Sequence, residues 1–212
     1  KVAVFMGVLL SITLTTALLT GERMNVLMWI FGGIIASFSW QTKWKRLLIS
    51  IVIGVGILGS IMKISEGVHA RYWGHIKSIV QAGDSSSYYR VIFSGPEAAR
   101  DSLAFGLGPA NYRHLCPELI SSGQFICSNH PHNFYIQLLT ETGVIGLIFG
   151  CLMLISILSA TFNGWRYFRG DLAAATAFII PLALFFPIKS SGDFFGQWNN
   201  IFLWSAIALS LT

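Results

Sequence analysis

Charged residues are scarce in this chain. Of its 212 residues, 14 are Lys or Arg and 9 are Asp or Glu, so only 11% are charged, whereas a soluble domain usually carries about 25%. Hydrophobic residues make up 54% and occur in long blocks. These two features exclude an ordinary soluble domain and indicate an integral membrane protein. The net charge of +5 does not indicate a nucleic-acid partner, because the basic residues are scattered between the apolar blocks, where such residues set membrane topology.

Cysteine is also rare. Cys116 and Cys127 lie in a polar stretch, and Cys151 lies in an apolar block, where we expect it to act as a small packing residue. In an oxidising compartment Cys116 and Cys127 could form a disulfide, and closing a loop of about 12 residues would stabilise the fold by roughly 3 kcal/mol. Two alternatives stay open: free thiols, or a metal site shared with His130 and His132. The spacing of these four residues is not a standard zinc pattern.

The apolar blocks predict an all-α, polytopic membrane protein. A helical span needs about 20 mostly apolar residues, and six segments approach that length. We therefore expect three transmembrane helices in 1–63, a long polar loop in 64–132, and three more helices in 133–212, with a short loop near 189–199. The six segments lie near 1–20, 24–40, 47–63, 133–160, 172–188 and 200–212.

The short loops predict the orientation. Segment 41–46 has three bases and no acid, and segment 163–171 has two bases and one acid. Loops rich in Lys and Arg face the cytoplasm, so the long loop 64–132 and the loop 189–200 are expected on the external side.

Within the long loop, we expect an amphipathic helix at 68–80 that lies on the membrane or covers a cavity. A second helix is expected at 88–104, weakened or bent by Pro96. We expect a turn at 106–109, because its two glycines permit backbone angles that other residues avoid.

All five histidines precede the fourth apolar segment. His130 and His132 stand at its mouth, separated by a proline, so an extended backbone is expected and the two side chains could point to opposite sides. A histidine near neutral pKa can take a proton from a hydroxyl. The alternative is that both histidines cap the start of the segment, a role that Asn133 could also fill. Gln137 and Glu141 follow where hydrocarbon should exclude them, and intramembrane polar residues are usually functional.

The remaining candidate functional or structural residues are two arginines, one aspartate and three glycines. Arg23 and Arg90 could bind a phosphate or diphosphate, for which the planar guanidinium is suited, or could be interfacial residues that reach toward water. Asp193 could orient a histidine, bind sugar hydroxyls, or be solvated. Close helix packing in the fourth span is the role expected for Gly143, Gly146 and Gly150.

Three sequence patterns carry a family resemblance. They are Thr-Gly-Glu-Arg at 20–23, Phe-Gly-Leu-Gly-Pro-Ala-Asn-Tyr at 105–112, and His-Pro-His-Asn-Phe-Tyr-Ile-Gln-Leu-Leu-Thr-Glu-Thr-Gly at 130–143. The chain resembles, over nearly its whole length, the C-terminal half of proteins in the O-antigen ligase and O-antigen polymerase superfamily. These are glycosyltransferases of the bacterial inner membrane.

The resemblance implies transfer of a glycan from a polyprenyl diphosphate carrier to an acceptor hydroxyl, with inversion and without a metal, a nucleotide sugar or another cofactor. It implies His132 as the base and Arg23 and Arg90 as diphosphate-binding catalytic residues. We expect a ligase whose acceptor is lipid A–core, with a polymerase or a protein O-oligosaccharyltransferase as alternatives. A lipid-linked sugar transporter and a non-catalytic subunit are alternatives of other classes. The expected substrate-binding residues are His130, Asn133, Tyr135 and Asp193.

Overall fold

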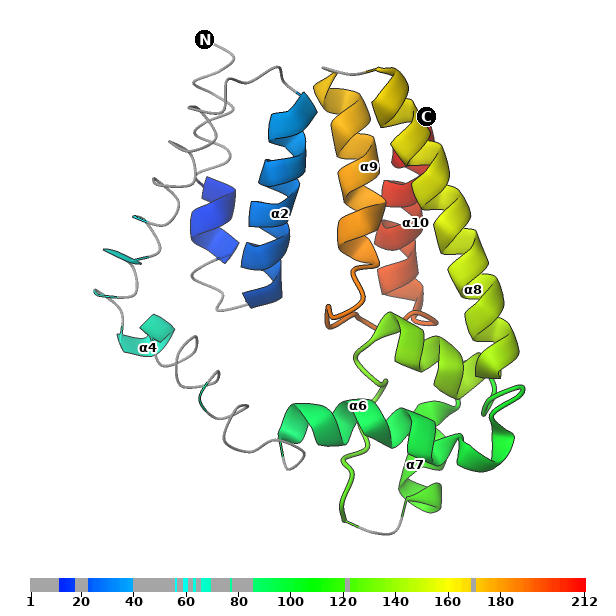
Figure 1. Cartoon of the computed structure of the whole chain (residues 1–212). Helices are drawn as coiled ribbons and strands as arrows, with labels where there is room; N and C mark the ends of the chain where they lie inside the picture. The colour runs from blue at the N-terminus through cyan, green and yellow to red at the C-terminus, as the bar shows by residue number, and fades with distance from the viewer. Residues whose placement is uncertain are drawn as a thin grey trace. The chain divides into compact units, whose positions relative to one another are not determined.

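A computed structural model describes residues 12–17, 23–39, 56, 59–60, 63, 66–69, 77, 86–120, 123–168 and 171–212 (Figure 1). Every regular element in these residues is a helix, and no strand occurs among them. The all-α prediction therefore agrees with the described part of the chain. Two compact units divide the chain, one formed by Lys1–Gln81 with Gly170–Ala175 and the other by Ala82–Arg169 with Thr176–Thr212.

The first unit contains a helical turn at 12–17 and the helices α2 (Arg23–Ser39) and α4 (Glu66–His69). The helix α2 matches the segment predicted near 24–40. The Trp29 indole Nε1 donates a hydrogen bond to Thr13 Oγ1 at 3.2 Å, which joins α2 to the turn at 12–17. The segments predicted at 1–20 and 47–63, the helix at 68–80 and the loop at 41–46 lie largely or wholly outside the described residues.

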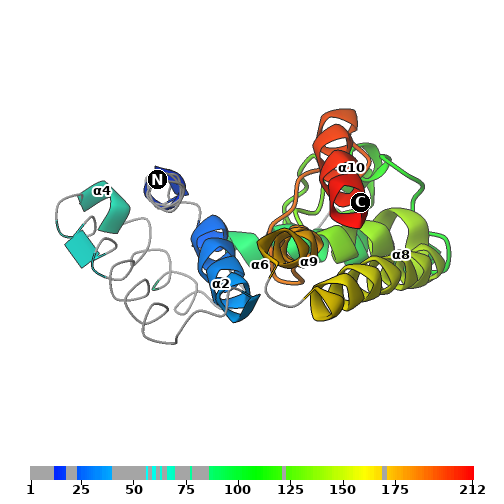
Figure 2. The same ribbon diagram turned by 90° about the horizontal axis from the view of Figure 1, so that it is seen from above.

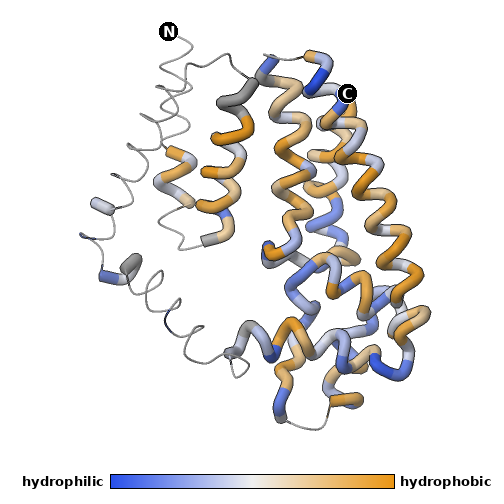
Figure 3. The backbone as a smooth tube through the Cα atoms, in the orientation of Figure 1, coloured by the Kyte–Doolittle hydropathy of each residue, from blue (hydrophilic) through white to orange (hydrophobic). Residues whose placement is uncertain are grey.

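The second unit contains the remaining helices, except that the first residues of α9, up to Ala175, belong to the first unit. A cluster of buried apolar side chains joins α8, α10 and the turn after α9. Figures 1 and 2 show α10 running beside α8, with which it is in contact, and Figure 3 shows largely apolar residues along α8, α9 and α10. The elements are α6 (Ser87–Ala98), η3 (Arg100–Ser102), α7 (Tyr112–Leu119), α8 (Phe134–Tyr167), α9 (Leu172–Leu184) and α10 (Gln197–Leu211).

The helix α8 is broken at Gly143. This residue has φ 69° and ψ −171°, which no α-helix contains, so α8 consists of a first arm (134–142) and a membrane arm (144–167). In the described part of the chain, α8 is the one helix long and apolar enough to cross a bilayer, and its membrane arm alone exceeds the required length of about 20 residues. The six-span count remains a prediction, since α2 and α9 supply only shorter apolar helices, Met24–Ile35 and Ala173–Leu184.

The break changes the interpretation of two expectations. Gly143 allows the close approach of another backbone segment and not of a helix, because its left-handed φ makes the turn between the two arms and a Cβ there would collide with the backbone of Ala104 and Phe105. Gly150 does serve close packing, since a Cβ there would collide with Leu138 Cδ1 of the first arm. The polar residues Gln137 and Glu141 lie on the first arm, before the membrane arm begins, so they are not exposed to hydrocarbon in the middle of a span.

The segment 103–108 supplies the backbone partners that the broken helix lacks. At the end of the first arm, Thr140 O and Glu141 O accept hydrogen bonds from the amides of Leu107 and Gly108, each at 2.9 Å. At the start of the membrane arm, the amide of Val144 donates to Leu103 O at 2.8 Å. A helix end leaves such groups without partners, and here a second chain segment satisfies them. We call this arrangement the Gly143 joint.

The Gly143 joint also explains why one predicted helix ends earlier in the structure than the sequence indicated. The helix predicted at 88–104 ends at Ala98 and continues as the 3₁₀ turn η3, with Pro96 inside α6. The carbonyls at 103 and 104 and the amides at 107 and 108 bond to α8 instead of continuing a helix. At the other end, Ser86 caps α6 by accepting a hydrogen bond from the Tyr89 amide at 3.2 Å.

Candidate active site

His132 occupies a strained backbone position at the start of α8. Its φ is 55°, in the left-handed region that a residue with a side chain rarely adopts. Such a conformation costs about 1–3 kcal/mol and persists only where the surroundings enforce it. Here the Ser191 amide donates to His132 O at 2.9 Å, and Asn133 caps the helix that follows.

The two histidine rings lie side by side. Their centroids are 4.3 Å apart, with an interplanar angle of 49°. The expectation that an extended backbone could point them to opposite sides is wrong, because the left-handed φ of His132 turns the chain there. His130 is fixed in turn by a hydrogen bond between its Nε2 and Ser191 O at 3.1 Å. Since a carbonyl only accepts, this Nε2 carries the hydrogen.

The environment of His132 favours its neutral form. Burial, and then the nearby His130, lower the pKa of His132 below its ordinary value of 6.5. Among the described residues, its imidazole contacts the His130 ring but makes no hydrogen bond. A neutral imidazole with an uncommitted nitrogen is the form that can accept a proton from a hydroxyl.

Asn133 and Tyr135 hold the segment after α9 against the start of α8. The Asn133 Oδ1 accepts hydrogen bonds from the amides of Tyr135 and Ile136, at 3.1 and 3.2 Å, so the predicted capping role is confirmed. Its Nδ2 donates to Pro187 O at 2.8 Å, and the Tyr135 hydroxyl donates to Phe185 O at 2.7 Å. Both predicted binding residues are thus also structural ties.

Gln137 and Asp193 connect the first arm to the loop between α9 and α10. Gln137 is fully buried, and its Nε2 donates to Asp193 Oδ1 at 2.6 Å while its Oε1 accepts from the Phe194 amide at 2.9 Å. Asp193 Oδ1 also accepts from the Phe195 amide at 3.0 Å. The structure therefore places Asp193 against Gln137, a contact that none of the roles considered for Asp193 had included.

Glu141 ties the first arm to the segment before α7. Its side chain is 1% exposed, and its two carboxylate oxygens accept hydrogen bonds from the backbone amides of Ala110 at 3.0 Å and Tyr112 at 3.3 Å. Gln137 Nε2 adds a third contact at 3.3 Å. These bonds lie beside the Gly143 joint and reinforce it.

Arg90 is held by the loop that the cysteines close. Its Nε donates to Gln124 O at 2.7 Å, and its NH2 nitrogen donates to Gly123 O at 2.5 Å. Cys116 and Cys127 form a disulfide around this loop, with their Cα atoms 5.8 Å apart. Of the three alternatives for these cysteines, the structure therefore has the disulfide, and no cluster that could hold a metal occurs in the described residues.

The predicted site residues are not all placed together. His130, His132, Asn133, Tyr135 and Asp193 are linked through the loop 185–194, as described above. Arg90 belongs to the same unit, on α6. Arg23 is the first residue of α2 in the other unit, and its side chain lies outside the described residues.

Two residues of this site were missed by the sequence interpretation. Ser191 binds His130 through its carbonyl and His132 through its amide, a backbone role that leaves no pattern in the sequence. Lys189 is half-buried, and burial lowers the pKa of its amine below the ordinary value. Its signal was available, because it is the only basic residue in the loop 189–199.

Comparison with known proteins gives one result. A family model described as "O-Antigen ligase" matches residues 7–151, which is more than half of the chain and includes the Gly143 joint and both histidines. No curated protein and no solved structure matches the chain.

Proposed function

The chain belongs to the O-antigen ligase family, and we propose that it transfers a glycan from a polyprenyl diphosphate carrier to a sugar hydroxyl of lipid A–core. Members of this family are glycosyltransferase-type proteins of the bacterial inner membrane, and α8 is a helix long enough to cross a bilayer. We propose further that the reaction takes place on the periplasmic side and uses neither a metal ion nor a nucleotide sugar.

The conformation and surroundings of His132 are the observation that supports this proposal. Its backbone is strained and its imidazole is partly buried. Its carbonyl accepts a hydrogen bond from the Ser191 amide, and Asn133 caps the helix that follows. Strain of this kind is concentrated at functional sites. A neutral imidazole held in a fixed position suits a general base, which must lie within hydrogen-bond reach of the proton that it removes.

The proposed reaction is a single displacement. His132 takes the proton of the acceptor hydroxyl as its oxygen attacks the anomeric carbon of the donor sugar. The bond from that carbon to the diphosphate oxygen breaks on the opposite face, and the electron pair leaves with polyprenyl diphosphate. The product is a new glycosidic bond with inverted configuration and a protonated His132, which returns its proton to solvent.

Arg90 is proposed to stabilise the diphosphate together with Arg23. Two of its N–H groups are bound by the carbonyls of Gly123 and Gln124. A guanidinium has five N–H donors, so the others are available to phosphate oxygens while the two carbonyls fix the orientation of the group. Positioned positive charge of this kind lowers the barrier where negative charge develops on a leaving group.

The four proposed substrate-binding residues combine two tasks. In the structure, Asn133 and Tyr135 hold the loop after α9, and His130 binds the carbonyl of Ser191. Contact with the substrate is the second task that we propose for them. Asp193 uses Oδ1 for its contacts with Gln137 and Phe195. Its Oδ2 is the atom that we propose accepts a hydrogen bond from a sugar hydroxyl.

The test is glycan transfer by the full-length protein in membranes. Polyprenyl-diphosphate glycan is supplied with lipid A–core, and the coupled product is measured for wild type, His132→Ala and the control His114→Ala, whose histidine is exposed on α7. Loss of a general base costs about 10²–10⁴ in rate, so His132→Ala should lose that factor while His114→Ala retains full activity. A His132→Ala protein with wild-type transfer would exclude His132 as the base.

The arginines and the acceptor need separate arms of this experiment. Arg90→Lys keeps the charge but loses the planar fork, and we expect weaker donor binding, with Arg113→Lys on the exposed face of α7 as its control. Arg23→Ala is expected to act on the donor in the same way. Coupling to a second lipid-linked repeat or to a protein, in place of lipid A–core, would indicate a polymerase or a protein O-oligosaccharyltransferase. Absence of any product would support a transporter or a non-catalytic subunit.

A further inference from the structure

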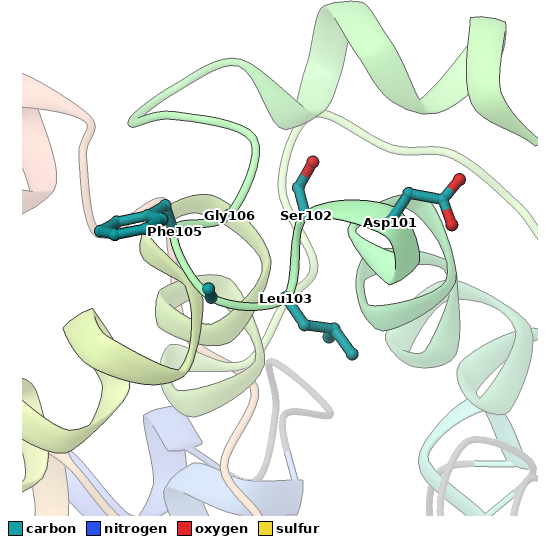
Figure 4. Close-up of a pocket in the computed structure, with 6 residues that line it drawn as sticks. Asp101, Ser102, Leu103, Phe105 and Gly106 are labelled. Atoms are coloured by element: carbon teal, nitrogen blue, oxygen red, sulfur yellow. The ribbon is translucent and has the colours of Figure 1, made fainter.

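The turn 101–106 exposes large apolar side chains beside the start of the membrane arm. It begins within η3, and its residues Leu103 and Ala104 contribute backbone carbonyls to the Gly143 joint. A pocket of about 270 Å³ is lined by its residues (Figure 4). Leu103 is 45% exposed and Phe105 is 75% exposed. Single exposed apolar residues are common on proteins, but two of them within one short turn form a patch that water solvates poorly.

The side chains of this turn point in different directions. In Figure 4, Leu103 and Ser102 extend to opposite sides of the turn, and the Phe105 ring extends away from Asp101. The Leu103 and Ser102 side chains therefore lie on opposite sides of the turn. Such separation is what a segment lying at a boundary between water and hydrocarbon requires.

The backbone fixes the level of this turn relative to α8. The amide of Val144 donates to Leu103 O at 2.8 Å, and the amide of Ile145 donates to Ala104 O at 3.4 Å. Val144 is the first residue of the membrane arm, so the turn lies at the level where that arm begins. The apolar surface continues along the membrane arm through the exposed side chains of Val144, Ile145, Ile148 and Phe149.

The charges near the turn exclude a mainly electrostatic attachment. Arg100 is exposed, but Glu97 lies 3.7 Å from its guanidinium and Asp101 follows it directly. Two acids around one base leave no positive patch for anionic headgroups. The surface that this turn offers to a partner is therefore the apolar side chains of Leu103 and Phe105.

We propose that the turn 101–106 is a membrane anchor that inserts Leu103 and Phe105 into the lipid bilayer at the boundary between headgroups and acyl chains. Ser102 stays on the water side of the same turn. Since Leu103 and Ala104 are bonded to the membrane arm of α8, and Leu107 and Gly108 just after the turn are bonded to the first arm, insertion holds η3 and the Gly143 joint at a fixed depth. This inference depends on α8 crossing the bilayer and not on the proposed chemistry.

Spin-label accessibility tests the anchor. Labels are attached to Leu103→Cys, Phe105→Cys and the matched control Ser102→Cys in full-length protein with Cys151→Ser, without reductant so that the disulfide stays intact. In proteoliposomes, the ratio of collision with oxygen to collision with a water-soluble nickel complex should be severalfold higher at 103 and 105 than at 102. The difference should be the same in zwitterionic and in anionic vesicles.

Three results would overturn the proposal. Equally low ratios at all three positions in a monodisperse protein would mean that the turn lies in water. Labels at 103 and 105 that neither reagent reaches would mean that protein covers the patch. A depth that appears only in anionic vesicles would mean that charge, and not apolar insertion, attaches the turn.

Discussion

Glu141→Gln is the change that most directly tests the Gly143 joint. The carboxylate is buried and accepts backbone hydrogen bonds from Ala110 and Tyr112. Glutamine has nearly the same shape, but it replaces one accepting oxygen with an NH₂ group. One of the two amides therefore keeps an acceptor, while the other faces a donor.

The expected magnitude follows from these two bonds. The bond that remains changes from a charged to a neutral acceptor and weakens by about 1 kcal/mol, and a buried amide left without an acceptor costs about 1–3 kcal/mol. The sum is about 2–4 kcal/mol of local stability. At 1.36 kcal/mol for each factor of ten, the amides of the joint should exchange roughly 30- to 1,000-fold faster.

Hydrogen exchange followed by mass spectrometry measures this effect locally. Peptides that contain Leu107, Gly108 and Tyr112 should take up deuterium faster in Glu141→Gln, because opening of the joint exposes their amides. Glu118→Gln is the matched control, since Glu118 is exposed on α7, and its exchange should equal that of wild type.

The combination of exchange and activity separates a structural role from a chemical one. If exchange in these peptides is unchanged in Glu141→Gln, the argument that the carboxylate holds the joint is refuted. Loss of glycan transfer with unchanged exchange would assign Glu141 to the reaction itself. Faster exchange accompanied by lower transfer is the outcome that we expect.

Three further predictions concern the disulfide, the pH dependence and the kink. Replacing Cys116 and Cys127 with serine should cost roughly 3 kcal/mol for a closed loop of about 12 residues, and reductant should lower the unfolding midpoint of wild type to that of the variant. Because burial and the neighbouring histidine lower the pKa of His132, the transfer rate should fall only on the acid side of pH 6.5. Folding stability contributed by the neutral ring should be complete above that pH and be lost as the pH falls through the lowered pKa; an acid limb above pH 6.5 in the rate profile would contradict this. Gly143→Ala should destabilise the fold by at least about 1–3 kcal/mol, because its φ and ψ lie in a region that is essentially restricted to glycine. Gly164→Ala, where a Cβ would meet open space within a helix, should not lower the midpoint of thermal unfolding, because alanine favours a helix more than glycine does.

Much of the described fold follows from local sequence patterns. The all-α class, the apolar segment from 133 onward and the helix after Ser86 each depend on composition or on capping over a few residues. Such patterns are local, so one sequence contains them. The disulfide between Cys116 and Cys127 was also one of the three alternatives that the sequence left open.

The features that the sequence did not predict are contacts between distant segments. Gly143 reads equally well as a packing residue in a straight helix or as a break, because its left-handed φ is stabilised by the segment 103–108, far away in the chain. Gln137 likewise shows its role only when Asp193 and Phe194 are beside it. The strained φ of His132 depends on Ser191 in the same way.

The family motif becomes physically intelligible once its residues are divided by what they bind. Asn133 binds the loop after α9, Gln137 binds the loop before α10, and Glu141 binds the segment before α7. Each of these side chains uses its polar atoms in hydrogen bonds to other parts of the protein. The His132 ring makes no such hydrogen bond to the described residues. A scaffold that fixes one base without specifying an acceptor is compatible with many acceptors, so the motif should identify the reaction and not the acceptor. Substitutions that change acceptor choice should therefore fall outside 130–143, and a chimera exchanging only that segment between a ligase and a polymerase should keep the acceptor of the host protein.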